Sequence, residues 1–362
     1  MGEPQSGSLK DFGEVVHTDL AEEKLGAASA ETMRALTRKV EAGPLKVEEM
    51  QFRVEDHGFQ CLVYRHRARK VTPHLVTWVT QMTADRLKIF EEMLKRWNGP
   101  VSVALYSQDV EKDVKEIDHL LDRVDFTIVG ASQGLYPVNT LRNVALNNAR
   151  TDFVVLADVD FVPGYGTYEA ISSFVQELQA AGRQNERKVY VFPAFEIDGD
   201  DQTVPHDFDK LKAMGGKIHQ VHNDGGREIA HKYTLYDTWM QAQEPYKVSY
   251  KFPYEPYILA PRFIPRYDVR FFGYGNDKAS HNYELNAAGF EFWVFPKHFM
   301  VHVRHPQGSW VQQTFMDPKD RVSRTLTTFL RDCDRRYSMR LSKQDAPTFA
   351  PLAPSAKFSA QV

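Results

Sequence analysis

The chain has 362 residues, enough for one large domain or two small ones, and its 42% apolar and 26% charged residues allow a sizeable core. A formal net charge of -3 without a long Lys/Arg run argues against a nucleic-acid partner, because phosphate backbones require clustered positive charge. Two cysteines, Cys61 and Cys333, exclude a disulfide framework, and we expect the chain to fold without a disulfide.

The two ends of the chain differ in composition from its middle. We expect residues 1–70 to form a partly disordered N-terminal arm, residues 71–340 to form one folded domain, and residues 341–362, which are rich in Ser, Ala and Pro, to form a flexible tail. The first twenty residues are polar and acidic and contain no apolar run typical of a signal peptide or a membrane span. These features predict a soluble, cytoplasmic protein with no membrane span in this chain.

Short apolar runs alternate with helical patterns in the first half of the predicted domain. Strands are predicted at His74–Val79, Val101–Tyr106, Phe126–Val129 and Phe153–Ala157, and helices at about Thr83–Trp97, Val110–Arg123 and Pro137–Arg150. This alternation predicts an α/β fold with a mostly parallel sheet flanked by helices. The second half is more mixed, with predicted elements at a strand ending near Ala260, a helix at about Lys278–Ala288, a strand at Glu291–Phe295 and a helix at roughly Lys319–Arg336.

Two aspartates, Asp158 and Asp160, follow directly after the apolar strand Phe153–Ala157. Ligands of open α/β sheets bind beyond the carboxyl ends of the strands. Two neighbouring carboxylates repel each other there, and Mn²⁺ or Mg²⁺ would relieve that repulsion and bridge to a diphosphate. The alternative is a pair of solvated turn aspartates, but the position after a buried strand favours a metal site.

A second apolar stretch ends in His302, Arg304 and His305. Imidazole is a good ligand for Mn²⁺-class ions, so one of the histidines is a candidate third metal ligand, although a buried, hydrogen-bonded histidine is the alternative. In a regular strand, alternation places His302 and Arg304 on one face and His305 on the other. Arg304 is a candidate to meet a diphosphate or a ligand carboxylate.

Arg142 and Asn143 lie on the helix that precedes the aspartate pair. Arginine grips phosphate or holds a carboxylate in place, so both residues are candidates to support a nucleotide or the aspartate loop. The alternative is an ordinary polar surface of a helix.

Two acidic residues are candidate general bases. Glu255 lies between aromatic residues and prolines, where it could accept a proton from a substrate hydroxyl or serve only as an ion-paired packing residue. Asp277 follows a glycine-rich turn and opens a helix, where a helix cap is the competing interpretation. Its neighbour Lys278 is a second candidate to meet a diphosphate.

These segments occur in an order that resembles a known family. The motifs are YPVNTLRNVA, VVLADVDFVP, YGTYE, VFPAFE, FPYEPYILAPR, RFFGYGNDKASHNYEL and FMVHVRH. Together they are similar to the catalytic C-terminal domain of LARGE-type and β-1,4-glucuronyltransferase-like glycosyltransferases, glycosyltransferase family 49. The resemblance spans roughly Thr72 to Tyr337. Asp277 stands where relatives carry Asn, and the segment Asp198–Ala230 matches poorly.

The resemblance implies a GT-A fold, in which a Rossmann-like nucleotide-sugar half joins a mixed acceptor-binding half. It implies an inverting transferase that uses Mn²⁺ (or Mg²⁺) and moves glucuronate, xylose or N-acetylglucosamine from a UDP-sugar to a glycan or glycoprotein acceptor. Its metal ligands would be Asp158, Asp160 and His302, and its compartment the Golgi lumen. The competing hypotheses are a non-catalytic sugar-binding module on a transferase fold and a phosphohydrolase whose first aspartate is a nucleophile.

Overall fold

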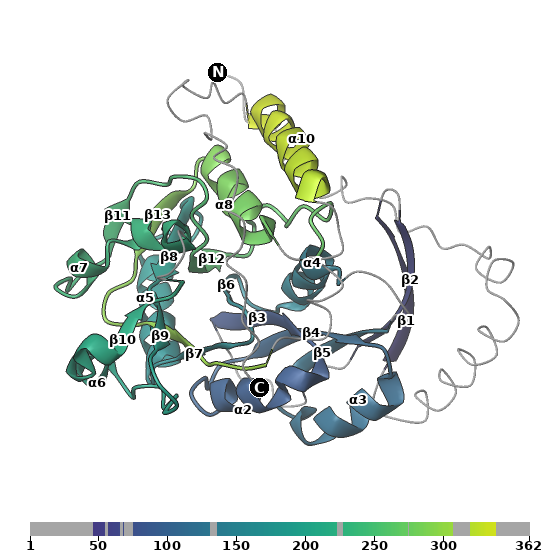
Figure 1. The fold of residues 1–362 in the computed structure, drawn as a ribbon, viewed down its shortest axis with the longest axis horizontal. Helices are drawn as coiled ribbons and strands as arrows, with labels where there is room; N and C mark the ends of the chain where they lie inside the picture. The colour runs from purple at the N-terminus through teal and green to yellow at the C-terminus, as the bar shows by residue number, and fades with distance from the viewer. Residues whose placement is uncertain are drawn as a thin grey trace, which may run out of the picture.

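The computed structural model describes residues 46–54, 57–65, 68, 75–130, 136–222, 227–273, 275–306 and 319–337. Its larger sheet has ten strands within these ranges (Figure 1). In spatial order they are β1 (Lys46–Val54), β2 (His57–Arg65), β5 (Asp125–Gly130), β4 (Val101–Ser107), β3 (Val76–Met82), β6 (Phe153–Leu156), β12 (Tyr257–Pro261), β8 (Lys188–Phe192), β13 (Glu291–Val294) and β11 (Tyr246–Val248).

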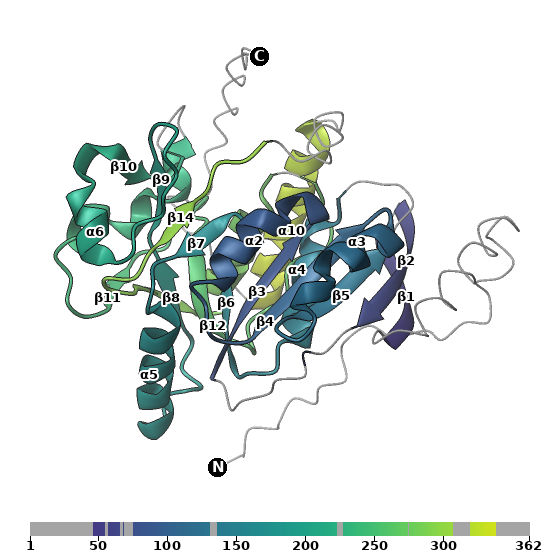
Figure 2. The ribbon, with the colours of Figure 1, turned by 90° about the horizontal axis from the view of Figure 1, so that it is seen from below.

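Four neighbouring strands, β5, β4, β3 and β6, run parallel to one another. Every residue of β3, β4 and β6 is buried, as expected for strands that are covered on both faces. Helices α2 (Leu87–Leu94) and α3 (Val110–Ile117) cover one face and α4 (Val138–Asn148) covers the other (Figures 1 and 2). The predicted parallel, Rossmann-like half is therefore confirmed.

The rest of the large sheet is mixed. Strand β12 is antiparallel to both β6 and β8, β13 is parallel to β8, and β11 is antiparallel to β13. Helix α5 (Thr167–Ala180) lies beside β8, and the short helices α6 (Phe208–Ala213) and α7 (Tyr236–Trp239) lie at the far end of this half (Figure 1). The predicted α/β fold with a mixed second half is confirmed.

A smaller, four-stranded sheet was not predicted from the sequence, although the apolar stretch that ends at the histidines does form one of its strands. Its order is β10 (Ile218–Gln220), β9 (Ala194–Ile197), β14 (Met300–His302) and β7 (Phe161–Pro163). Strand β14 is parallel to β9 and antiparallel to β7, so it lies between two segments that are distant in sequence. This sheet brings the end of β14 next to the segment that follows β6.

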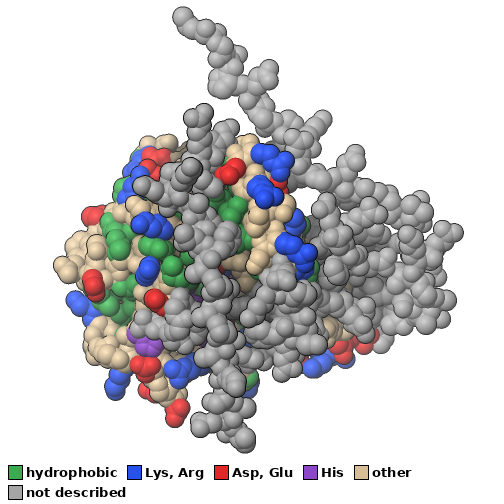
Figure 3. Space-filling model, turned by 45° about the horizontal axis from the view of Figure 1, so that its top comes forward, with side chains coloured by type: hydrophobic (Ala, Val, Ile, Leu, Met, Phe, Trp, Pro, Cys, Tyr) green, Lys and Arg blue, Asp and Glu red, His purple; other side chains and the backbone are tan. Residues whose placement is uncertain are grey.

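The last two described helices pack together. Helix α8 (Asp277–Ala287) contributes Tyr283 and helix α10 (Lys319–Tyr337) contributes Leu326, Phe329 and Cys333 to a small apolar cluster. Cys333 is free and buried, whereas the side chain of Cys61 lies outside the described residues. The described surface of one face mixes hydrophobic, basic and acidic side chains (Figure 3), in keeping with a net charge near zero.

The N-terminal hairpin β1–β2 extends the large sheet, because β2 pairs with β5. It falls inside the predicted arm of residues 1–70, and the domain limits at residues 70 and 340 stay a prediction. Residues 1–45 and 338–362 lie outside the described part of the chain. Within the described residues, no helix combines the length and the apolar character that crossing a membrane requires.

Candidate functional site

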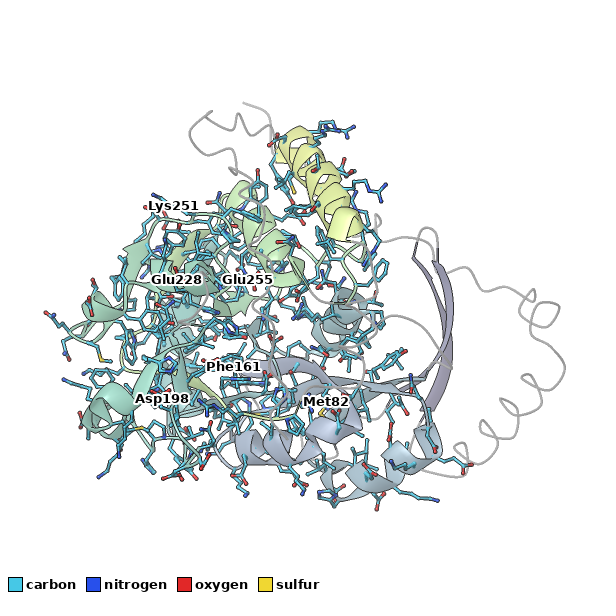
Figure 4. All side chains as sticks on the ribbon, in the orientation of Figure 1. Met82, Phe161, Asp198, Glu228, Lys251 and Glu255 are labelled. Atoms are coloured by element: carbon cyan, nitrogen blue, oxygen red, sulfur yellow. The ribbon has the colours of Figure 1, made fainter. Side chains whose placement is uncertain are left out.

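The aspartate pair lies in a turn at the carboxyl end of β6. The turn begins where Ala157 N–H donates to the Val79 carbonyl of β3, and it closes where Phe161 N–H donates to the Asp158 carbonyl, 3.2 Å away. Val303 N–H then donates to the Asp160 carbonyl at 2.9 Å, which fixes the turn against the end of β14. Figure 4 labels Phe161, which follows the pair, and Glu255 in the central part of the molecule.

The Asp158 carboxylate is held by two cations, the buried Arg142 and the partly buried Lys278. Arg142 of α4 donates to its Oδ1 at 2.9 Å, and Lys278 of α8 donates to its Oδ2, to which the Tyr257 hydroxyl also donates at 3.1 Å. Burial alone would raise the pKa of Asp158, but Lys278 and Arg142 outweigh burial and lower the pKa to about 2. Asp158 is therefore ionised and engaged with cations.

Arg142 links Asp158 to Asp277, whose Oδ2 lies 2.5 Å from the Arg142 Nη1. The guanidinium also packs over the Tyr267 ring, 5.3 Å from the ring centre. Asn143 does not contact these carboxylates. Its side chain exchanges two hydrogen bonds with the backbone of Tyr267, at 2.8 and 2.9 Å, and so fixes the segment on which Arg142 packs.

The Asp160 carboxylate faces a different set of partners. Its Oδ2 lies 2.9 Å from His305 Nε2 and 3.5 Å from His302 Nε2. Its Oδ1 is buried and has no hydrogen-bond partner within the described residues. The expectation that His305 points away from His302 is wrong, because β14 ends at His302 and strand alternation does not continue to His305.

Asp160, His302 and His305 form a group that suits a metal ion. Their ligand atoms all lie within 4.8 Å of one another. Among the described residues, this is the one group of three or more His, Cys, Asp or Glu side chains close enough to share a metal ion. One carboxylate and two imidazoles match the ligand preferences of Mn²⁺-class ions, and the unpartnered Asp160 Oδ1 is an open acceptor. Asp158, the other predicted ligand, is not in the group, because its oxygens contact Lys278, Arg142 and Tyr257.

The two carboxylates around His302 change its proton affinity. Burial alone would lower the pKa of His302, but Asp160 and Glu196 outweigh burial and raise it to about 9. Conversely, burial would raise the pKa of Asp160, yet hydrogen bonding to His302 and His305 holds that pKa far below its usual range. The imidazole of His302 therefore carries a proton near neutral pH when no metal competes for it.

Glu255 is partly buried two residues before β12, where its backbone N–H donates to the Ala230 carbonyl at 2.8 Å. Burial is the main reason that the pKa of its carboxyl is raised to about 7; the nearby charge of Lys278 lowers it, and that of Asp277 raises it. No described side chain forms a hydrogen bond with this carboxylate. Glu255 is thus a carboxyl group that can exchange a proton near neutral pH.

A cavity opens beside Asp158, between the ends of β3 and β6, the start of β12, and helices α4 and α8. Its wall includes Thr80, Lys278, His281 and Asn282. The hydroxyl of Thr80, the amide oxygen of Asn282 and the Nδ1 of His281 are buried without a hydrogen-bond partner within the described residues. The cavity therefore offers polar atoms that a ligand or ordered water would satisfy.

Arg304 lies outside this constellation. Its side chain is exposed, and its Nη1 donates to the Gly199 carbonyl at 3.2 Å. Tyr257 and Glu196 belong to the site, but the sequence motifs did not single them out. Tyr257 follows the Glu255-Pro256 pair, and Glu196 interrupts the apolar run of β9, which was the available signal for an inward-facing carboxylate.

The chain belongs to the family described as "Glycosyl-transferase for dystroglycan", whose family model matches residues 75–131 and 122–338. It is 35% identical to the rat protein named Xylosyl- and glucuronyltransferase LARGE2 over 292 residues, which cover 78% of this chain and 42% of that protein. It is also 34% identical to mouse Xylosyl- and glucuronyltransferase LARGE1, over 74% of this chain and 36% of that protein.

The chain thus spans less than half the length of these curated relatives. Among solved structures, it is similar to S. aureus TarS 1–349 in complex with UDP-GlcNAc, with 13% sequence identity, a TM-score of 0.43, and coverage of 71% of this chain and 66% of that one. That distant similarity does not bear on the site.

Proposed function

We propose that this chain transfers a sugar from a UDP-sugar to a hydroxyl group of a glycan or glycoprotein acceptor, with inversion at the anomeric carbon and with a divalent metal ion, Mn²⁺ or Mg²⁺. The observation that carries the proposal is the Asp160 carboxylate, which lies between two imidazoles with one buried oxygen unpartnered. The names of the relatives favour xylose or glucuronate as the transferred sugar, and N-acetylglucosamine is the third candidate.

Asp160, His302 and His305 are the proposed metal ligands. A divalent ion held there would offset the negative charge that develops on the departing UDP. Asp158 has a separate role in this proposal, because it fixes Lys278 and Arg142 at the edge of the cavity. These two cations are the candidates to meet the donor phosphates, whereas Asn143 supports Arg142 through Tyr267. Arg304 is not included, because its side chain is exposed and contacts the Gly199 carbonyl.

Glu255 is the proposed general base. An inverting transfer needs a group that removes the proton of the attacking acceptor hydroxyl, and such a base works best with a pKa near the working pH. The pKa of Glu255, about 7, meets that requirement. Asp277, the second candidate, is ion-paired with Arg142 at 2.5 Å, so proton transfer to it would weaken that contact.

A donor panel tests the proposed function. The purified chain is incubated with a glycan acceptor and UDP-glucuronate, UDP-xylose or UDP-N-acetylglucosamine, with Mn²⁺ or with a chelator, and the release of UDP is measured. We expect Mn²⁺-dependent turnover of at least one donor, and NMR of the product should show the inverted anomer. Equal turnover in chelator would contradict the metal proposal, and hydrolysis of phosphate esters without use of any UDP-sugar would favour a phosphohydrolase.

The pKa of His302 predicts how Mn²⁺ binding depends on pH. Because this pKa is raised to about 9, the metal must displace a proton from the imidazole at any lower pH. We expect the apparent Mn²⁺ affinity to fall about tenfold for each unit of decrease in pH below about 8.5, with release of about one proton per ion. Calorimetry in two buffers of different ionisation enthalpy measures both quantities, and an affinity independent of pH would exclude His302 as a ligand.

A further inference from the structure

A row of side chains crosses the four-stranded sheet next to the proposed metal group. The strand register places His219 of β10 opposite Glu196 of β9, and Glu196 beside His302 of β14. On the other side of β14, His302 is paired with Phe161 of β7. Side chains at paired positions of neighbouring strands lie on the same face, so the backbone register itself sets Glu196 next to His302.

The two ring nitrogens of His302 face two different carboxylates. Its Nε2 lies 3.5 Å from Asp160 Oδ2, and its Nδ1 lies 3.5 Å from Glu196 Oε1. The Nδ1 atom is buried and has no hydrogen-bond partner within the described residues, so the Glu196 carboxylate is the acceptor that faces it, at ion-pair distance. The ring also packs against Phe161, with ring centres 5.2 Å apart, which limits its rotation.

We infer that Glu196 is a positioning residue for His302: its carboxylate holds the proton on Nδ1 and thereby leaves Nε2 as the nitrogen that binds the metal. This inference rests on the metal site of the proposed function. A neutral imidazole ligates through one nitrogen and carries its proton on the other, and a carboxylate facing the protonated nitrogen fixes both the tautomer and the ring orientation.

Glu196 is not itself a member of the proposed ligand group. The described residues whose ligand atoms lie mutually within 4.8 Å are Asp160, His302 and His305. A third histidine instead backs Glu196, because His222 Nδ1 lies 3.7 Å from the same Oε1 that faces His302. The Glu196 carboxylate thus lies between His222 and His302, and its contact with His222 keeps it next to the proposed metal ligand His302.

The test is Mn²⁺ binding by the full chain, measured by electron paramagnetic resonance, for Glu196→Ala and Glu196→Gln. Loss of a carboxylate behind a histidine ligand typically weakens metal binding about 10–100-fold, and we expect that loss for Glu196→Ala. Glu196→Gln should lose less, because its amide oxygen can still accept a hydrogen bond from Nδ1–H. Spin-echo spectra should show that a directly bound imidazole nitrogen is lost or weakened in Glu196→Ala and retained in Glu196→Gln.

Asp198→Asn is the matched control. Asp198 is an exposed carboxylate two residues beyond Glu196 and pairs with His219, 3.1 Å away, rather than with His302. Its substitution removes the same charge from the same region and should leave Mn²⁺ affinity unchanged. Thermal unfolding confirms that each variant is folded. Glu196→Leu, which keeps the bulk of the side chain but has no hydrogen-bond acceptor, carries the test if Glu196→Ala does not fold, and the loss expected for it is the same.

Three results would overturn the inference. If wild-type and both Glu196 variants bind Mn²⁺ equally and with the same nitrogen couplings, Glu196 does not position His302, although the metal site stands. If Asp198→Asn weakens binding as much as Glu196→Ala, the effect is one of general charge. If the wild-type chain binds no Mn²⁺, the proposed metal site fails and this inference fails with it.

Discussion

Asp160→Asn should abolish Mn²⁺ binding and metal-dependent transfer while leaving the fold intact. The change keeps the shape of the side chain but removes the charge that both His302 and His305 contact. The loss of turnover should exceed the roughly 10–100-fold effect typical of residues that stand behind a metal ligand. Activity titrated against Mn²⁺, together with the thermal unfolding temperature, provides the measurement.

Two further aspartate variants sharpen this prediction. Asp152→Asn, at the opposite end of β6, replaces an exposed carboxylate and should leave both activity and Mn²⁺ affinity unchanged. Asp158→Asn should lower turnover while retaining much of the Mn²⁺ affinity, because Asp158 contacts Arg142 and Lys278 rather than the histidines. If Asp158→Asn also abolishes Mn²⁺ binding, the metal ligands must include Asp158, as the aspartate pair in the sequence first suggested.

The parallel half of the fold and its aspartate pair were predictable from the sequence because the signal is local. The predicted strand Val101–Tyr106 appears as Val101–Ser107, and Phe153–Ala157 as Phe153–Leu156. These runs are continuously apolar because they are buried on both faces, and buried parallel strands have that signature. The general rule that ligands bind beyond the carboxyl ends of such strands then located Asp158 and Asp160.

The partners of those aspartates were not predictable, because they depend on contacts between distant segments. Lys278 reaches Asp158 across 120 positions of sequence, and His305 reaches Asp160 across 145. The strands of the small sheet, three or four residues long, are too short to show a periodic pattern, so the pairing of Glu196 with His302 left no sequence signal. For the same reason, the sequence could not show that β14 ends at His302.

Glu255→Gln should lower the turnover number by about 10²–10⁴-fold while changing donor and Mn²⁺ binding little, because the variant loses only the proton acceptor. The pH profile provides the more specific measurement. A base works in its ionised form, so at Mn²⁺ concentrations that saturate the enzyme at every pH tested, the raised pKa of about 7 predicts that wild-type kcat/KM increases with pH and levels off above about pH 7. That ascending limb should disappear in Glu255→Gln and persist in Glu244→Gln, an exposed glutamate that serves as the control.

Asp277→Asn separates the two candidate bases. Burial raises the pKa of Glu255 most, Lys278 lowers it, and the negative charge of Asp277 raises it further. Removing that charge should therefore shift the ascending limb of kcat/KM to lower pH without abolishing it. The substitution also breaks the ion pair with Arg142, so some loss of activity is expected at every pH. If instead Asp277→Asn abolishes the limb and Glu255→Gln retains it, Asp277 is the base, and the proton near pH 7 on Glu255 has no part in the transfer.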